Sequence, residues 1–136
     1  MSAFSYKTTY VVYASPEDVF EALTDPGIIG AWGGGMSVIE EKIGGHFELF
    51  DGWVKGEVTH FSPGKELGYT WKPAEWDKRT KPSNVHIKLM KHPAGTDIVL
   101  THTNFPSQEE ADKHGNGWID YVLDPMNDYF VMQREE

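Results

Sequence analysis

The chain has 136 residues, a length typical of one domain, and carries a formal net charge of −9. This acidic balance argues against nucleic-acid binding, which needs clustered Lys and Arg to neutralise phosphates. The one basic cluster, in the loop KPAEWDKRTKP, is typical of a solvated loop. No apolar run approaches the roughly 20 residues that cross a bilayer, so we expect no membrane insertion.

Two further features of the composition narrow the class of protein. There is no cysteine, which excludes disulfides and thiol catalysis. Together with the absence of a signal-peptide pattern in MSAFSYKTTY, this fits a cytoplasmic protein. The chain is also rich in aromatic residues, with five Trp, six Tyr and seven Phe, and we expect most of these rings to point inward.

The chain begins with one predicted strand and two short helices. Residues 4–14 are β-branched and aromatic, which indicates a strand. Ser15 is a good N-cap and Pro16 suits the first helical position, so SPEDVFEALTD is predicted to form a helix. Pro26 and Gly27 break that helix, and IIGAW can form a second one before a run of three glycines.

The middle of the chain is predicted to form antiparallel strands. They are MSVIEE, GGHFELF, WVKGEVTHF, ELGYTW, NVHIKLMKH and TDIVLTHTNF, joined by turns at Asp51-Gly52, Pro63-Gly64 and Pro93–Gly95. The side chains alternate, as with Phe47 and Leu49 on one face and His46 and Glu48 on the other. Tight hairpins of this kind indicate a meander with one apolar face.

The last segment is predicted to be a long helix that begins at the cap Ser107. Its inward stripe contains Trp118, Tyr121, Val122, Pro125, Met126 and Tyr129. Pro125 removes one backbone hydrogen bond and clashes with the preceding turn, so we expect a bend. Two interpretations of the bend are open: it improves core packing alone, or it leaves a cavity between the helix and the sheet. The large aromatic side chains expected there favour the cavity.

These elements predict an α+β fold over residues 1–136 as a single domain. It has a curved antiparallel sheet of about six or seven strands, two short helices, and a long C-terminal helix packed across the sheet. The apolar face of the sheet must be covered, and only the last helix is long enough to do so.

Several motifs, in this order along the chain, resemble one superfamily. They are ASPEDVFEALTDP followed by Trp32, then GGHF, KGEVTHFSPGKELGYTW, LTHTNFP, and HGNGW at the start of the final helix. The chain resembles the SRPBCC or START-like superfamily, also called birch-pollen-allergen-like. Within it, the chain is similar to single-domain proteins related to the C-terminal domain of the activator of the heat-shock-protein-90 ATPase. Pro125 departs from the family pattern, in which the last helix is usually uninterrupted.

The resemblance implies a START-like helix-grip domain with a deep, largely apolar cavity between the sheet and the C-terminal helix. Superfamily members bind lipids, sterols, polyketides and other hydrophobic molecules, so it also implies a small hydrophobic ligand. The predicted ligand-binding residues are those expected to face the cavity: Trp32, Phe47, Leu49, Val58, Tyr69, Trp71, Ile87, Leu100, His102, Asn104, Trp118, Tyr121, Val122, Pro125, Met126 and Tyr129.

His102 is the one candidate for catalysis. It shares a strand face with apolar neighbours and with Asn104, so we expect both to point inward. A buried imidazole can meet a ligand or act as an acid or base, but it can also be a core residue satisfied by a Tyr or a backbone group. Tyr69, Tyr121 and Tyr129 are the other candidate polar groups of the cavity.

Three tryptophans have further predicted places. Trp53, after a hairpin turn, and Trp76, in the basic loop, should lie near the cavity mouth, where they gate it or pack on the surface. Trp32 should pack between the small helices and the final helix. The six His show no His-x-x-x-His spacing and Cys is absent, so neither a metal site nor a cofactor is expected.

Three functions fit these observations. The first is a binding module for a small, mostly hydrophobic ligand. The second is an enzyme of the cyclase, aromatase or hydrolase type, in which His102 and an inward Tyr are acid and base. The third is an activator or co-chaperone of a heat-shock ATPase. A homodimer formed through exposed sheet edges or the cavity mouth is compatible with each of them.

Overall fold

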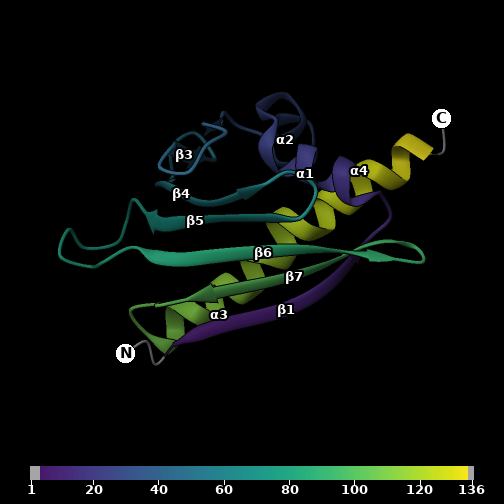
Figure 1. Cartoon of the computed structure of the whole chain (residues 1–136). Coiled ribbons are helices and arrows are strands. Elements are labelled where there is room, and N and C mark those ends of the chain that lie inside the picture. Colours follow the sequence, from purple (N-terminus) through teal and green to yellow (C-terminus); the bar gives the residue numbers. More distant parts are fainter. Residues whose placement is uncertain (1–3, 135–136) are drawn as a thin grey trace.

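The computed structural model describes residues 4–134 and has the predicted α+β helix-grip fold, in which helices cover one face of a single curved antiparallel sheet (Figure 1). From one edge to the other, the strands are β1 (Ser5–Val12), β7 (Gly95–Thr103), β6 (Ser83–His92), β5 (Glu66–Pro73), β4 (Val54–Ser62), β3 (His46–Leu49) and β2 (Val38–Ile39). Strands β2 to β7 therefore form the expected meander, and β1 joins the sheet beside β7.

Two short helices follow β1, and side-chain caps define where each begins. The hydroxyl of Ser15 accepts a hydrogen bond from the backbone N–H of Asp18 (3.2 Å) at the start of α1 (Pro16–Thr24). The carboxylate of Asp25 accepts from the N–H groups of the next helix, α2 (Pro26–Gly33). Pro26 therefore opens the second helix as its first residue, earlier than the segment IIGAW had indicated.

The alternation predicted for the strands is confirmed. Phe47 and Leu49 are buried whereas His46 is exposed and Glu48 half-buried. The same pattern buries the inner faces of β4 to β7. On β4, Gly56 lies so close to β5 that a Cβ at this position would stand 1.9 Å from the Thr70 carbonyl oxygen. A glycine is therefore required there for the two strands to pair.

The C-terminal helix runs across the sheet in three consecutive parts (Figure 1). α3 (Gln108–Gly117) begins at the predicted cap, Ser107, whose hydroxyl accepts from the Glu110 N–H (3.1 Å). A π-helical turn, η1 (Trp118–Leu123), follows and leads into α4 (Asp124–Arg134). Among the helices of residues 4–134, none combines the length and hydropathy needed to cross a membrane.

The π turn explains how the helix accommodates Pro125. The Asp124 N–H donates to the Ile119 carbonyl, five residues back, and Pro125 is then the second residue of α4. A proline in the first turn of a helix costs little, because its missing N–H would have few partners there.

The π turn also corrects one prediction about the helix face. Tyr121 was expected to point inward with Trp118 and Val122, but its exposed fraction is 68%. A π turn holds more residues than an α turn, so the 100° periodicity used for the prediction fails across it. Trp118, Val122 and Met126 are buried as predicted, whereas Tyr129 is half-buried.

A close contact fixes α3 against the edge strand β1. Gly115 is buried, and a Cβ at this position would stand 2.7 Å from the ring of Tyr6. The Gly-Asn-Gly sequence, which weakens the helix on propensity alone, therefore lets the helix backbone lie directly on an aromatic ring of the sheet.

Aromatic rings fill most of the space between sheet and helix. The rings of Phe47 and Tyr69 stack with centroids 3.8 Å apart, and those of Trp71 and Trp118 lie 5.0 Å apart. All four side chains are buried. The deep cavity that the family resemblance implied is therefore reduced to a smaller pocket at one end of the helix.

Candidate ligand pocket

A pocket of about 190 Å³ lies where α3 and η1 meet the turn between β3 and β4. Its walls are mainly aromatic, and its rim carries three charged residues. The lining residues are Phe50, Trp53, Trp71, Glu75, Glu110, Lys113, His114, Gly117, Trp118, Tyr121 and Val122. The sheet contributes Trp71 from β5, whereas the helix contributes one face of α3 and η1.

His114 and Trp71 form the first of two indole–imidazole pairs. The Trp71 Nε1–H donates to His114 Nε2 (3.0 Å), so this nitrogen must be unprotonated. The other nitrogen, Nδ1, lies 2.9 Å from the Glu110 carbonyl oxygen and donates to it as Nδ1–H. Burial lowers the pKa of His114, although its hydrogen bond to the Glu110 backbone acts in the opposite direction. The ring is therefore neutral and held in one tautomer.

His102 and Trp118 form the second pair, deeper in the core. The Trp118 Nε1–H donates to His102 Nδ1 (3.0 Å), so the proton of the neutral ring sits on Nε2 and is donated to the Ser83 hydroxyl (2.7 Å). Ser83 in turn donates to the Trp71 carbonyl oxygen (2.7 Å). Burial, together with the nearby His114, lowers the pKa of His102 to about 2.

This arrangement favours one of the two interpretations of His102. The side chain has no exposed surface, both ring nitrogens are engaged, and it is outside the pocket lining. A ring in this state has neither a free lone pair nor a proton to transfer near neutral pH. The geometry is that of a satisfied core histidine that orients Trp118 and, through Ser83, the backbone of Trp71.

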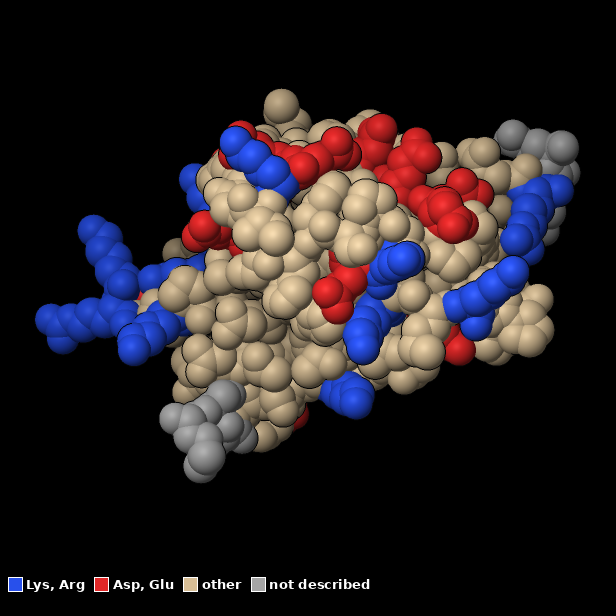
Figure 2. Space-filling model, viewed as in Figure 1, with Lys and Arg blue, Asp and Glu red and all other residues tan. Residues whose placement is uncertain are grey.

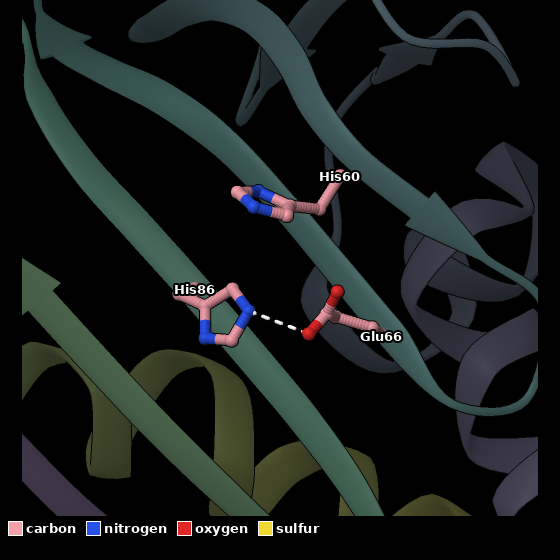
Figure 3. A group of neighbouring side chains, drawn as sticks. All are labelled: His60, Glu66 and His86. Carbon is pink, nitrogen blue, oxygen red and sulfur yellow. Dashed lines mark hydrogen bonds and ion pairs between the residues drawn. The ribbon is translucent and has the colours of Figure 1, made fainter.

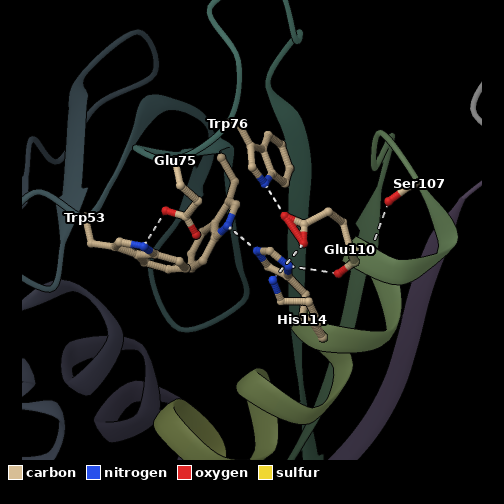
Figure 4. A network of polar contacts seen from close by, with 8 residues as sticks. Trp53, Glu75, Trp76, Ser107, Glu110 and His114 are labelled. Atoms are coloured by element: carbon tan, nitrogen blue, oxygen red, sulfur yellow. Dashed lines mark hydrogen bonds and ion pairs between the residues drawn. The ribbon is translucent and has the colours of Figure 1, made fainter.

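A set of carboxylates lies around the pocket rim (Figure 4). Glu75 accepts from the Trp53 Nε1–H at 2.7 Å. Glu110 accepts from the Trp76 Nε1–H through one oxygen, and its other oxygen lies 3.5 Å from Lys113 Nζ. These bonds hold two indole rings in place and leave an acidic border around an apolar interior.

The predicted ligand-binding residues are divided between several places. Trp71, Trp118, Tyr121 and Val122 line the pocket. The core contains Phe47, Leu49, Val58, Tyr69, Ile87, Leu100, His102 and Met126. At the other end of the helix, a shallow depression between α2 and α4 includes Trp32, Pro125 and Tyr129. Trp32 thus packs between the small helices and the final helix as predicted, and its Nε1–H donates to the Ala22 carbonyl.

Asn104 departs from its predicted inward position. β7 ends at Thr103, and Asn104 adopts a positive φ of 67°, which turns the chain and ends the alternation that buries His102. The side chain is half-buried, and its amide nitrogen lies 3.4 Å from the Pro82 carbonyl oxygen.

The two tryptophans expected at the cavity mouth, Trp53 and Trp76, have different environments. Trp53 lines the pocket and is partly exposed, as predicted for a residue at the mouth. Trp76 is buried in a small second core with Phe105 and Ala111, so this loop residue packs in a hydrophobic cluster separate from the main core. This corrects the expectation that the Trp76 ring lies at the surface or gates the cavity.

The sequence interpretation missed the polar part of the pocket, which comes from α3. Glu110, His114 and Trp118 are spaced four residues apart and therefore share one helix face. Extending the predicted inward stripe from Trp118 by two helical turns toward Ser107 would have identified His114 and Glu110. Glu75 carried no such signal, because it lies in an irregular loop.

Comparisons with known proteins agree with this fold. Residues 13–130 match the model of a family described as "Activator of Hsp90 ATPase homolog 1-like protein". Among curated proteins, the activator of 90 kDa heat shock protein ATPase homolog 1 from Mus musculus is 23% identical over 116 residues, which are 85% of this chain and 34% of that protein. A homologue from Dictyostelium discoideum is 24% identical over 85% of this chain and 30% of its own length. The chain thus spans about a third of the curated relatives it matches.

Solved structures of similar shape match over almost the whole chain. An HSP90 activator from Plasmodium falciparum has a TM-score of 0.83 and 26% identity, covering 95% of this chain and 97% of that one. A protein from Mesorhizobium loti has a TM-score of 0.80 and 24% identity, covering 97% and 98% respectively, and this likeness bears on the fold alone.

Proposed function

The chain belongs to the family of Activator of Hsp90 ATPase homolog 1-like proteins, and within that family we propose that it is a binding module for a small, flat, mostly apolar molecule. The observation that carries the proposal is the aromatic pocket beside η1, whose walls include Trp53, Trp71 and Trp118. A cytoplasmic location, expected from the sequence, is part of the same proposal.

The size of the pocket limits the class of ligand. Pockets for drug-sized molecules have volumes of roughly 300 Å³ or more, whereas this one has about 190 Å³. Lipids and sterols are too large for such a space without a rearrangement of the core. A molecule with one or two rings fits better.

The arrangement of rings supports a flat occupant. The Trp53 and Trp71 rings are nearly perpendicular, with an interplanar angle of 81° and centroids 6.1 Å apart, while the Trp53 and His114 rings are almost parallel at 6.3 Å. Walls of this kind offer both faces and edges to a planar molecule, which are the contacts that aromatic pairs prefer.

The charges at the rim favour a hydrogen-bond donor on the ligand. Glu75 and Glu110 are acceptors, and Lys113 already lies near Glu110. His114 presents no free nitrogen, because both of its nitrogens are engaged within the protein. An amine, amide or hydroxyl group at one end of a ring is therefore the expected polar feature of the ligand.

The proposal can be tested with small aromatic probes in ligand-observed NMR, using indole, phenol and benzylamine. We expect at least one probe to bind with a dissociation constant below about 1 mM, equivalent to about −4 kcal/mol. W53A removes one wall and should weaken binding at least about fivefold. Y13A changes an exposed tyrosine outside the pocket and should leave binding unchanged. Failure of all three probes to bind, or equal binding to W53A, would refute the proposal.

A second candidate function is activation of a heat-shock ATPase. It is supported by the names of the curated relatives and of the Plasmodium falciparum protein, whose solved chain this one covers almost completely. The test is the turnover of a heat-shock-protein-90 ATPase from the same host with and without this protein. An increase that saturates with protein concentration would support the activator function, and an unchanged turnover would exclude it for that ATPase.

The enzyme alternative has the weakest support. It assigned acid–base catalysis to His102 and an inward Tyr, but His102 is enclosed by Ser83 and Trp118. Tyr69 is fully buried, and burial raises the pKa of its phenol well above the usual value, so the hydroxyl stays protonated. We therefore place binding before catalysis in the proposed function.

A further inference from the structure

The outer face of the sheet, opposite the helix, carries a second group of chemically active side chains. On β4, the register with β5 shifts between Val58 and His60, which is the signature of a β-bulge at Thr59. Strict alternation from Val58, which is buried, would turn His60 toward the core. The extra residue instead leaves Thr59 and His60 both exposed, on the outer face.

A glycine on the next strand provides the space in which the rings of two histidines approach each other. In register, Gly68 on β5 lies opposite both His60 on β4 and His86 on β6. A Cβ at Gly68 would stand 2.6 Å from His60 Nδ1, so the His60 ring occupies the space that a side chain would take. The rings of His60 and His86 consequently approach to a centroid distance of 4.9 Å, although a whole strand separates their backbones.

A carboxylate completes the group (Figure 3). Glu66, two residues before Gly68 on β5, places its Oε2 2.9 Å from His86 Nε2. One ligand atom from each of His60, Glu66 and His86 lies within 4.8 Å of the other two. Ligands bound at about 2.1 Å to a tetrahedral ion stand roughly 3.4 Å apart, so small side-chain rotations would bring these atoms to coordination distance.

The surroundings also orient one of the rings. The Thr59 hydroxyl lies 3.0 Å from His60 Nδ1, a contact that fixes the ring and leaves its Nε2 for an ion. Hydrogen bonds of this kind to the second ring nitrogen accompany almost all metal-binding histidines. Thr59 reaches the outer face because of the same bulge that exposes His60.

We propose that His60, Glu66 and His86 bind a divalent transition-metal ion, with Zn²⁺ as the best match. Two imidazoles and one carboxylate suit Zn²⁺, whereas Ca²⁺ and Mg²⁺ prefer sites made of oxygen ligands. Three protein ligands leave one position for water or another donor. The site lies on the face of the sheet away from the aromatic pocket and does not depend on the proposed function.

The test is isothermal titration of the protein with ZnCl₂. Native protein should take up one Zn²⁺ per chain, and H60Q and H86Q should each weaken binding at least about tenfold. H46Q is the matched control. His46 is exposed and lies 2.5 Å from Glu48, so it forms a similar pair on the same sheet, but without a second histidine in the group. Its removal should leave Zn²⁺ binding unchanged.

A structural effect can be separated from a loss of ligands. The three variants change side chains on the outer face, so their thermal midpoints without metal should match that of the native protein. ZnCl₂ should raise the midpoint of native protein and H46Q, but not of H60Q or H86Q. The proposal is overturned if native protein shows no saturable binding, or if H60Q and H86Q bind Zn²⁺ as tightly as native protein does.

Discussion

Acid should destabilise this protein because the folded state keeps His102 neutral, and the substitution H102Q should remove this part of the acid sensitivity. The folded protein holds the pKa of this residue at about 2, whereas a histidine in an unfolded chain titrates near 6.5. Below about pH 6.5 the unfolded state therefore binds a proton that the folded state does not, and the free energy of unfolding falls as the pH falls. The stabilising contribution is complete above that pH.

The size of the effect follows from these two pKa values. Between pH 7 and pH 4.5, the single histidine lowers the free energy of unfolding by about 2.5 kcal/mol. This is a large share of the stability of a typical domain, which is about 5–15 kcal/mol. Burial also lowers the pKa of His114, which acts in the same direction, so both histidines make the folded state sensitive to acid.

Urea unfolding followed by far-ultraviolet circular dichroism at several pH values measures this loss. H102Q can still accept from Trp118 and donate to Ser83 but does not titrate, so its loss of stability between pH 7 and pH 4.5 should be smaller by about 2.5 kcal/mol. H92Q, at a half-buried position outside the core, is the control substitution. An equal pH dependence in native protein and H102Q would refute the assignment of His102 as a neutral core residue.

Three further substitutions test the packing, each by the change in the free energy of unfolding in urea. P125A should change it by less than about 1 kcal/mol, because Pro125 lies in the first turn of α4; a gain near 3 kcal/mol would mean that the proline strains a helix interior. G56A should cost about 3 kcal/mol or more, since its Cβ meets the Thr70 carbonyl, and a neutral result would show that β4 and β5 can separate easily. M126A removes a fully buried side chain and should cost about 2–5 kcal/mol, whereas a cost below 1 kcal/mol would place that residue outside the core.

Much of the fold could be predicted because its signals are local. Ser15 and Ser107 are caps whose hydroxyls accept the hydrogen bonds that the sequence indicated. The alternation around Phe47 and Leu49 requires only that side chains of a strand point to opposite faces in turn. Such patterns hold as long as no residue is inserted into the repeat.

The errors arose where the backbone departs from a regular repeat. The π turn rotates Tyr121 outward, and the positive φ of Asn104 ends the alternation that β7 had followed. Pro125 indicated a bend in this helix, but nothing in the sequence identified the bend as a π turn. Each depends on how one element packs against another, which a single-residue pattern does not contain.

The sites were harder to predict than the fold, because their residues come together only in three dimensions. The metal-binding group combines three strands, and its assembly depends on Gly68 providing space between two rings. A deep cavity was expected from the family resemblance, but stacked rings such as those of Phe47 and Tyr69 fill most of the space between sheet and helix. Aromatic content predicts that rings lie inside, not how much room they leave.

The basic loop between β5 and β6 has the exposure that the sequence indicated. Figure 2 shows Lys and Arg side chains projecting at the end of the molecule where this loop lies, whereas Asp and Glu cover the side that carries α2 and β3. The basic side chains in the loop, Lys78, Arg79 and Lys81, are mostly solvated. The chain as a whole has 12 Lys and Arg but 21 Asp and Glu, so acidic residues predominate outside this loop.

The position of β1 in the sheet has a consequence for synthesis on the ribosome. β1 is made first, but its hydrogen-bonding partner is β7, and Ser5 pairs with Thr103. At about 5–20 residues per second, β1 waits roughly 5–20 s before β7 has been made. During that interval its backbone N–H and C=O groups lack their native partners, and the unpaired strand can join another nascent copy. The rate of translation between β1 and β7 therefore sets how long each new chain is exposed to aggregation.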